Sequence, residues 1–319
     1  MMYLTQTWAS RLLVWPLIFL VVLAAHGCSS QDSKKTDSPT DQFLIVATTG
    51  MIADAASIVA GSHCQVQALM GPGVDPHLYK ATQGDLQKLT DADLILYNGL
   101  HLEGKMGDVF KKLARKKAVV PVAEKALAKE LLRQSPKYAD AYDPHVWFDV
   151  GLWRQVVAQI TKELQAQLPQ HAEAFQQNGT AYMARLDSLH QAVQTQIATI
   201  PESQRILVTA HDAFGYFGDA YDIRVQGLQG ISTVSDFGLK DRIELVNLIT
   251  ENRIKAVFVE TSVSPRFVEA VVEDCKDKGH EVQIGGYLYS DAMGQAGTPA
   301  GYYIGMVNAN VQTIVNGLR

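Results

Sequence analysis

Two short stretches of the sequence place a histidine after the same dipeptide. The stretches VDPHLY and YDPHVW put His77 and His145 directly after Asp-Pro. Proline fixes its own φ at about −65° and keeps the preceding residue out of the α conformation, so each histidine leaves a rigid, non-helical turn. Asp75 and Asp143 can accept hydrogen bonds from nearby backbone N–H groups. One such tripeptide alone is typical of a surface turn, whereas two copies favour a pair of rigidly held metal ligands.

Two further side chains complete a donor set for a divalent transition metal. His211 follows a predicted strand in VTAHDAF, and Asp291 follows another in YLYSDAMG. Three imidazoles and one carboxylate that face one another would suit such an ion. Taken singly, His211 also fits a strand-end histidine beside a helix N-terminus, and Asp291 fits a helix cap or turn. Glu260, which ends a predicted strand, is a candidate for orienting a ligand histidine. His101, which follows a predicted strand, is a candidate for lining the cleft.

These residues lie in a chain that alternates strands and helices twice. The first half has predicted strands within residues 43–50, 64–70, 91–99 and 117–124, with helices at 51–61, 82–90 and 105–116. The second half has a predicted strand that runs into a turn and helix within 205–217, further strands within 223–228, 254–260 and 280–288, and helices at 239–253 and 264–279. Such alternation predicts parallel sheets covered on both faces. The expected fold class is α/β, with two similar lobes that each hold a four-stranded parallel sheet flanked by helices.

Residues 169–201 are predicted to join the two halves as one long helix. Apolar residues recur there at steps of three and four, which indicates a single helical stripe. Such a segment spans about 45 Å, and Gly179 is its weak point, at a cost of about 1 kcal/mol. We expect a first lobe over residues 43–168 and a second over 202–319. A rigid connecting helix would allow small tilts and resist wide hinge opening.

The predicted strands explain how distant residues meet. Ligands of open α/β sheets bind outside the carboxyl ends of the strands. His77 and His145 follow strands of the first half, and His211 and Asp291 follow strands of the second half. Each half therefore offers two groups at one edge of its sheet, and we predict a metal site in the cleft between the lobes.

The first 28 residues carry the pattern of an export signal. Arg11 precedes the apolar run LLVWPLIFLVVLAA, and HGCSS follows it. The run is short for a membrane-spanning helix, which needs about 20 apolar residues, so residues 1–27 are predicted to be a signal peptide. Cys28 resembles the lipidated cysteine of bacterial lipoproteins, and the polar residues 28–42 predict a disordered tether. Ordinary cleavage nearby would instead yield a soluble periplasmic protein.

The composition restricts the class of partner and the role of the cysteines. The chain is 47% hydrophobic and 19% charged, which is typical of a soluble globular protein. Its formal net charge of −5 argues against nucleic acid as a partner, because phosphate binding needs clustered Lys and Arg. After signal cleavage, Cys64 and Cys275 remain without metal-type spacing. We expect two small buried hydrophobic residues, with a disulfide as the alternative.

Seven motifs, taken together, resemble one known family. They are TTGMIADA, MGPGVDPHLYKAT, ADLILYNGLHLE, DPHVWFDV, LVTAHDAFGYF, GLQGIST and GGYLYSDAMGQAGTPAGYYIGMVNANVQTIV. In this order, over nearly the whole mature chain, the sequence is similar to the cluster A-I metal-binding (solute-binding) proteins of bacterial ABC transporters, most closely the TroA type. The resemblance implies two α/β lobes, a rigid connecting helix and one metal ion between the lobes. The implied ligands are His77, His145, His211 and Asp291.

The resemblance leaves the metal open between zinc and manganese. Manganese-restricted members of the family usually have Glu where this chain has His211. Dedicated zinc members often carry a long His-rich and acidic loop before the second histidine, and no such loop precedes His145. Three nitrogens and one carboxylate suit tetrahedral Zn²⁺, whereas a bidentate Asp291 would give the five-coordination that Mn²⁺ accepts. We expect one ion per chain.

The resemblance implies a carrier and not an enzyme. The expected protein is exported to the periplasm or cell surface, lipid-anchored and monomeric, and it delivers its ion to an ABC permease. The ATPase must be a separate chain, because the sequence lacks a G-x-x-x-x-G-K-[ST] loop. Two alternatives stay open. The first is a surface adhesin or interaction lipoprotein. The second is a metallohydrolase, which would need an open metal position and a general base.

Overall fold

The computed structural model of the chain describes residues 42–135, 138–234 and 238–319. The predicted signal peptide, Cys28 and all of the predicted tether except Gln42 lie outside these residues. No helix among the described residues is both long enough and apolar enough to cross a membrane.

The first half folds around a four-stranded parallel sheet. Its strands, in spatial order, are β2 (Cys64–Ala68), β1 (Phe43–Ala47), β3 (Leu94–Tyr97) and β4 (Ala118–Pro121). The helices of this half are α1 (Gly50–Ala60), α2 (Gln83–Asp91), α3 (Gly107–Leu113) and α4 (Val122–Ala126). In β1, Ile45 and Ala47 pack into one core cluster and Val46 into another. Both faces of the sheet are therefore buried, as the continuous apolar strands predict.

An antiparallel hairpin and a long helix follow β4, and neither was predicted. Strand β5 (Gln134–Ser135) pairs with β6 (Tyr138–Tyr142), and the 3-10 helix η3 (Val146–Phe148) leads into α5 (Val150–Gln167). The Asp149 carboxylate caps α5, accepting hydrogen bonds from the backbone N–H groups of Gly151 (2.8 Å) and Leu152 (3.2 Å). His145 therefore follows the hairpin strand β6 and not a strand of the main sheet.

The second half is α/β as predicted, with its strands hydrogen-bonded as two parallel pairs. Strand β7 (Ile206–His211) pairs with β8 (Arg224–Gln229), and β9 (Ala256–Glu260) pairs with β10 (Gln283–Leu288). Strands β7 and β9 lie side by side. The helices are α7 (Gly215–Tyr221), α8 (Leu239–Glu251), α9 (Arg266–Asp277) and α10 (Tyr303–Leu318). The carboxyl ends of β7, β9 and β10 carry three of the residues singled out in the sequence.

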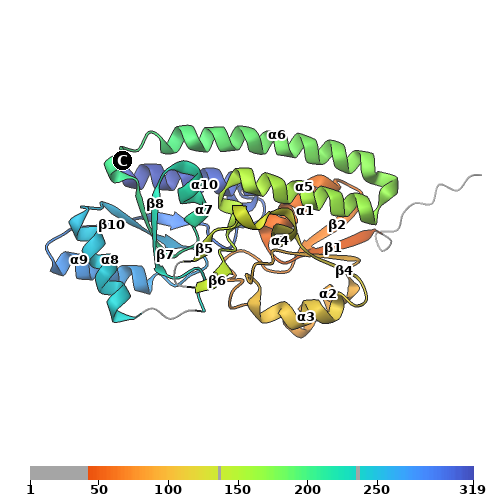
Figure 1. The fold of residues 1–319 in the computed structure, drawn as a ribbon, viewed down its shortest axis with the longest axis horizontal. Helices are drawn as coiled ribbons and strands as arrows, with labels where there is room; N and C mark the ends of the chain where they lie inside the picture. Colours follow the sequence, from red (N-terminus) through yellow and green to blue (C-terminus); the bar gives the residue numbers. More distant parts are fainter. Residues whose placement is uncertain (1–41, 136–137, 235–237) are drawn as a thin grey trace, which may run out of the picture. The chain divides into compact units, whose positions relative to one another are not determined.

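The long helix α6 (Ala172–Ile197) lies within the predicted connector and packs against α5, α1 and α10 (Figure 1). The predicted apolar stripe is buried, comprising Phe175, Gly179, Tyr182, Leu186, Leu189, Val193 and Ile197. A Cβ at residue 179 would clash with Thr161 on α5, so glycine permits the close approach of the two helices. The predicted single long helix is therefore confirmed, and it is packed along α5. The lobe boundaries at residues 168 and 202 remain predictions.

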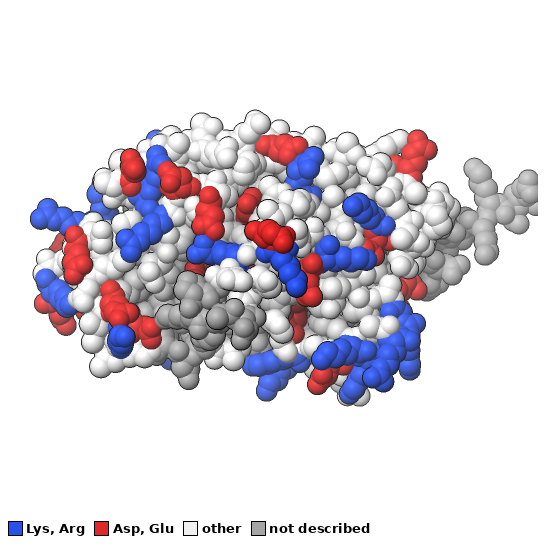
Figure 2. Space-filling view, viewed as in Figure 1, with Lys and Arg blue, Asp and Glu red and all other residues white. Residues whose placement is uncertain are grey.

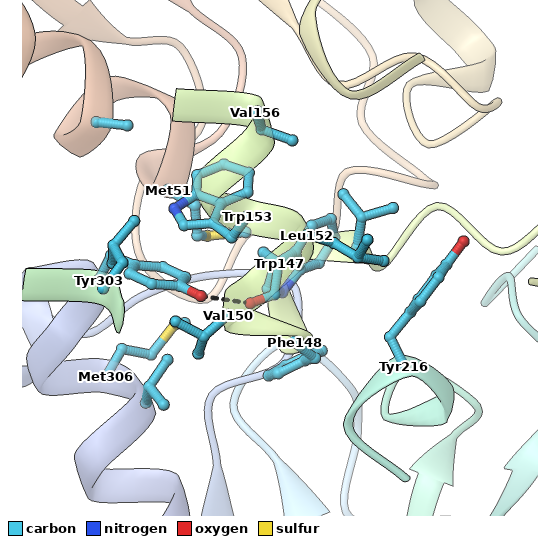
Figure 3. Close-up of a cluster of buried hydrophobic side chains, with 14 of the residues drawn as sticks. Met51, Trp147, Phe148, Val150, Leu152, Trp153, Val156, Tyr216, Tyr303 and Met306 are labelled. Carbon is cyan, nitrogen blue, oxygen red and sulfur yellow. Dashed lines mark hydrogen bonds between the residues drawn. The ribbon is translucent and has the colours of Figure 1, made fainter. Parts of the chain in front are cut away.

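One aromatic cluster joins elements from both halves (Figure 3). Tyr303 of α10 donates a hydrogen bond from its hydroxyl to the backbone oxygen of Trp147, at 2.7 Å. The rings of Phe148 and Phe214, just before α7, stack with centroids 4.2 Å apart. Because these side chains are almost completely buried, the segment around Trp147 is held from both halves of the chain.

The surface carries charges of both signs, and the cysteines lie inside. Figure 2 shows Lys and Arg interspersed with Asp and Glu, with blue groups gathered at the lower right, where Figure 1 draws α2 and α3. Cys64 and Cys275 are buried and free, so the structure contains two small buried residues and no bond between them. Burial raises the pKa of both thiols to about 11, which makes them unreactive.

Candidate metal centre

The structure brings together the four predicted ligands from four separate segments. His77 lies in the loop after β2, and His145 lies in the turn after β6. His211 is the last residue of β7, and Asp291 lies three residues after β10. Their side chains are buried, and one nitrogen or oxygen of each lies within 4.8 Å of all the others. The two halves therefore contribute equally to one buried cluster.

The separations within this cluster are those of a tetrahedral metal site. The Nε2 atom of His145 lies 3.3 Å from Nε2 of His77 and 3.4 Å from Nε2 of His211. Asp291 Oδ1 lies 3.3 Å from Nε2 of His145. Its Oδ2 lies 3.4 Å from Nε2 of His211 and 3.6 Å from Nε2 of His77. Zinc bonds of about 2.0–2.1 Å give tetrahedral edges of about 3.3–3.4 Å, so the group can hold one ion.

The carboxylate of Asp291 is buried and faces imidazole nitrogens with both of its oxygens. The side chain is 2% exposed, yet neither oxygen accepts a hydrogen bond from the described part of the chain. A buried carboxylate is costly unless positive charge compensates it, and either protonated His145 and His211 or a bound metal ion can supply that charge. Because both oxygens face imidazole nitrogens, the carboxylate can bind an ion through one oxygen or through both. The geometry therefore accommodates four-coordinate zinc and five-coordinate manganese.

Neighbouring charges set different protonation states for the three imidazoles. Burial, which Asp291 offsets only in part, lowers the pKa of His77 to about 3. Burial also opposes protonation of His145, but adjacent carboxylates raise its pKa to about 9. Glu260 and Asp291 likewise overcome burial and raise the pKa of His211 well above its ordinary value. The charges on His211 and His145 outweigh burial and hold the pKa of Asp291 well below its usual range. The raised pKa values of His145 and His211 therefore predict that metal binding competes with protons at these two imidazoles.

The matching family model is that of the zinc-uptake complex component A, periplasmic, named ZnuA, and it covers residues 45–317 of this chain. The chain belongs to the ZnuA family. The match spans the described strands and helices from β1 to α10, including all four residues of the buried cluster.

Individual relatives match along almost the whole chain. The manganese-binding lipoprotein MntA of Bacillus subtilis is 50% identical over 302 residues, which covers 95% of this chain and 97% of the relative. The zinc-binding protein TroA of Treponema pallidum is 47% identical over 293 residues, covering 92% of this chain and 93% of the relative. A solved structure of periplasmic TroA superposes with a TM-score of 0.84, over 87% of this chain and 99% of that one. The names of these two relatives record different metals.

Carboxylates hold two of the imidazoles of this ZnuA-family site from behind. Asp143 Oδ1 accepts a hydrogen bond from the backbone N–H of His145 at 3.0 Å and lies 2.7 Å from its Nδ1. Glu260 Oε1 accepts from the backbone N–H of His211 at 2.8 Å, and its Oε2 lies 2.5 Å from Nδ1 of that residue. A carboxylate at Nδ1 leaves Nε2 free to bind metal and fixes the orientation of the ring.

Replacing Glu260 with Gln is expected to weaken metal binding about 10- to 100-fold, the usual cost of losing such a supporting partner. The amide keeps an acceptor for the backbone of His211 but removes the charge opposite Nδ1. Zinc titration against a competing chelator measures the change. Glu163→Gln is the matched control, since Glu163 is also buried but pairs with Lys125 on α4. Parental affinity in Glu260→Gln would argue against an orienting role.

His101 does not join the cluster. It is exposed on the loop after β3, where it lines a separate cavity with Lys105 and Lys111. Its φ of +66° follows a φ of +54° at Leu100. The backbone of this loop is therefore left-handed at two successive residues. His101 lines the cavity with Lys105 and Lys111 instead of the buried cluster.

Two residues beside His101, Asn98 and Glu103, contribute instead to the hydrogen bonds behind His145, and neither was predicted. The Asn98 side-chain amide donates a hydrogen bond to the backbone oxygen of Pro144 at 3.0 Å, directly before His145. The buried carboxylate of Glu103 accepts from the backbone N–H groups of Asn98 (2.8 Å) and Gly99 (3.2 Å). A Cβ at Gly99, which has a φ of +81°, would lie 2.9 Å from Pro121. The Asn-Gly pair after a strand was the available signal.

Proposed function

We propose that this chain is the extracytoplasmic metal-binding component of an ABC importer. It captures one Zn²⁺ or Mn²⁺ ion at His77, His145, His211 and Asp291, and it delivers the ion to a membrane permease driven by a separate ATPase. The observation that carries the proposal is the buried set of three imidazoles and one carboxylate with tetrahedral edge lengths. Membership of the ZnuA family and the metal-binding names of its relatives support it.

A carrier role fits the chemistry of the site better than catalysis. Four protein ligands leave no open position for a water molecule or substrate, which a catalytic zinc site requires. The family is one of transporter components, which supports the carrier and gives no support to a metallohydrolase or a primary adhesin. Relatives with lipoprotein names support export and a lipid anchor at Cys28. We propose that the anchored chain works as a monomer.

The cargo is zinc, manganese or both, and the donor set explains why the choice needs measurement. The Irving–Williams order makes zinc bind more tightly than manganese to almost any such site in vitro. The ion delivered in the cell therefore depends on supply as well as on affinity. Elemental analysis of chain purified from its native host without chelators, together with titrations of both ions, should find one ion per chain. A chain that carries and binds neither ion would overturn the proposal.

Transport itself is tested in cells. Cells that depend on this chain for zinc or manganese uptake should lose that uptake when Asp291 is replaced with Ala, at unchanged protein level. A Glu163→Gln chain is the control and should support normal uptake. Undiminished uptake with the Asp291→Ala chain would contradict a carrier role for this site.

A further inference from the structure

We propose that Asp75 couples His77 to the second half of the chain, and that its hydrogen bond to Thr233 slows the release of bound metal. This inference rests on the proposed metal binding by the buried cluster. Asp75 is a positioning residue here, because it acts on the ion through His77.

The two oxygens of the Asp75 carboxylate contact different halves of the chain. Oδ1 accepts a hydrogen bond from the backbone N–H of His77 at 2.8 Å, and Oδ2 accepts one from the hydroxyl of Thr233 at 2.6 Å. Asp75 follows β2, whereas Thr233 lies in the second half after β8. Pro76 restricts the backbone between Asp75 and His77. A displacement of the Asp75 carboxylate is therefore expected to displace His77 as well.

The second Asp-Pro-His turn is contacted by the second half in a similar way. Asp143 holds His145, and its backbone oxygen accepts a hydrogen bond from the hydroxyl of Tyr216 on α7, at 3.0 Å. That hydroxyl also accepts from the backbone N–H of Arg133, at 2.9 Å. Both turns of the repeated motif thus present an aspartate that touches its own histidine and, in the same residue, the opposite half.

The Asp75–Thr233 and Asp143–Tyr216 hydrogen bonds differ in burial, and the less buried of the two is expected to break more readily. Tyr216 is 3% exposed and belongs to the aromatic cluster in Figure 3, and Phe214 beside it stacks on Phe148. Thr233 is only half-buried, and the adjacent Val234 is 55% exposed. Separation of the halves near Asp143 would open a packed core, whereas the Asp75–Thr233 hydrogen bond joins side chains that are already partly exposed. Local opening follows the less buried contacts.

The Asp75–Thr233 hydrogen bond joins the two halves, and we expect it to affect the dissociation rate of the ion more than the association rate. In the proposed order of events, the ion reaches the site before the Asp75–Thr233 bond forms, so losing the bond leaves the association rate unchanged. Dissociation requires the bond to break first. Because Asp75 is a carboxylate, the bond is charge-assisted, and its loss is expected to speed release about tenfold and weaken affinity by the same factor.

The test compares Thr233→Val, which keeps the side-chain shape but has no hydroxyl, with Thr233→Ser, which keeps the hydroxyl. The full mature chain loaded with Zn²⁺ is mixed in a stopped-flow instrument with excess chromogenic chelator, at concentrations where the rate no longer depends on chelator. Association is followed by tryptophan fluorescence, because the Trp147 ring centroid lies 5.2 Å from that of His145. We expect about tenfold faster release in Thr233→Val, near-parental release in Thr233→Ser, and parental association in both.

A double-mutant cycle with Asp75→Asn shows whether the two side chains act through one bond. Asparagine keeps an acceptor for His77 but weakens the bond to Thr233, so the double variant should release zinc little faster than the faster single variant. Three results would overturn the proposal in a chain that binds zinc: parental release in Thr233→Val, equally fast release in Thr233→Ser, or fully additive effects. A parental chain that binds neither zinc nor manganese would overturn the proposed function first and this inference with it.

Discussion

Replacing His77 with Ala should remove most of the stabilisation that metal gives the chain while leaving the fold intact. Of the three imidazoles, His77 is the one with a depressed pKa, about 3, so its removal takes away a neutral group. By contrast, removal of His145 would take the imidazole away from the fully buried carboxylate of Asp143. At zinc concentrations 1,000-fold above the dissociation constant, the parent gains about 4 kcal/mol. A loss of affinity beyond about 100-fold would leave the variant with about 1.4 kcal/mol or less.

The readout is the difference in melting temperature with and without Zn²⁺, because that difference cancels any effect of the substitution on the ion-free fold. His101→Asn is the matched control. It changes a histidine of the same half, outside the cluster, and Asn tolerates the φ of +66° at that position. The control should keep the full metal-dependent rise. An equal rise in His77→Ala and in the parent would remove His77 from the set of ligands.

The four residues of the buried cluster could be predicted to meet because each one carries a local sequence signal, while their role as ligands stays a prediction. Each Asp-Pro-His turn is a rigid device within three residues, and His211 and Asp291 could be assigned to one sheet edge from the order of strands alone. The same strand-end rule pointed to Glu260, which the structure places on Nδ1 of His211. It also pointed to His101, which the structure places elsewhere. The rule locates an edge of a sheet but not the direction of a side chain.

The supporting contacts could not be predicted, because their partners lie far apart in the sequence. Asp75 and Thr233 are 158 residues apart, and no periodicity marks a threonine in a loop as the partner of a particular aspartate. Helix α5 is a different case. Its N-cap Asp149 and buried apolar positions were visible in the sequence, and the missing assignment hid the packed pair that α5 forms with α6. Gly179, taken as a weak point, is the residue that makes this pairing possible.

Metal affinity should fall steeply with pH from well above the ordinary range of histidine. Metal competes with protons for imidazole nitrogens, so affinity decreases as the pH drops below the pKa of each ligand. An unperturbed histidine titrates near 6.5 and would make affinity almost constant above about pH 7.5. Here Asp143 and Asp291 overcome burial and raise the pKa of His145 to about 9, and that of His211 is also raised. With both protonated, affinity should fall by about two powers of ten per pH unit.

The interval from pH 8.5 to pH 7 distinguishes these cases, because only raised pKa values make affinity change there by more than about tenfold. Calorimetry in buffers of different protonation enthalpy gives an independent count of the protons released, which we expect to be about two per zinc ion at pH 7.

The Glu260→Gln variant tests whether Glu260 is the cause of the raised pKa of His211. Removing the charge that raises the pKa of His211 should lower the count toward one while weakening affinity. The carboxylates behind the imidazoles would then have two opposing effects: they orient the rings for metal, and they make protons stronger competitors. A flat affinity over this interval with no proton release would show that the ligands are neutral before the ion arrives.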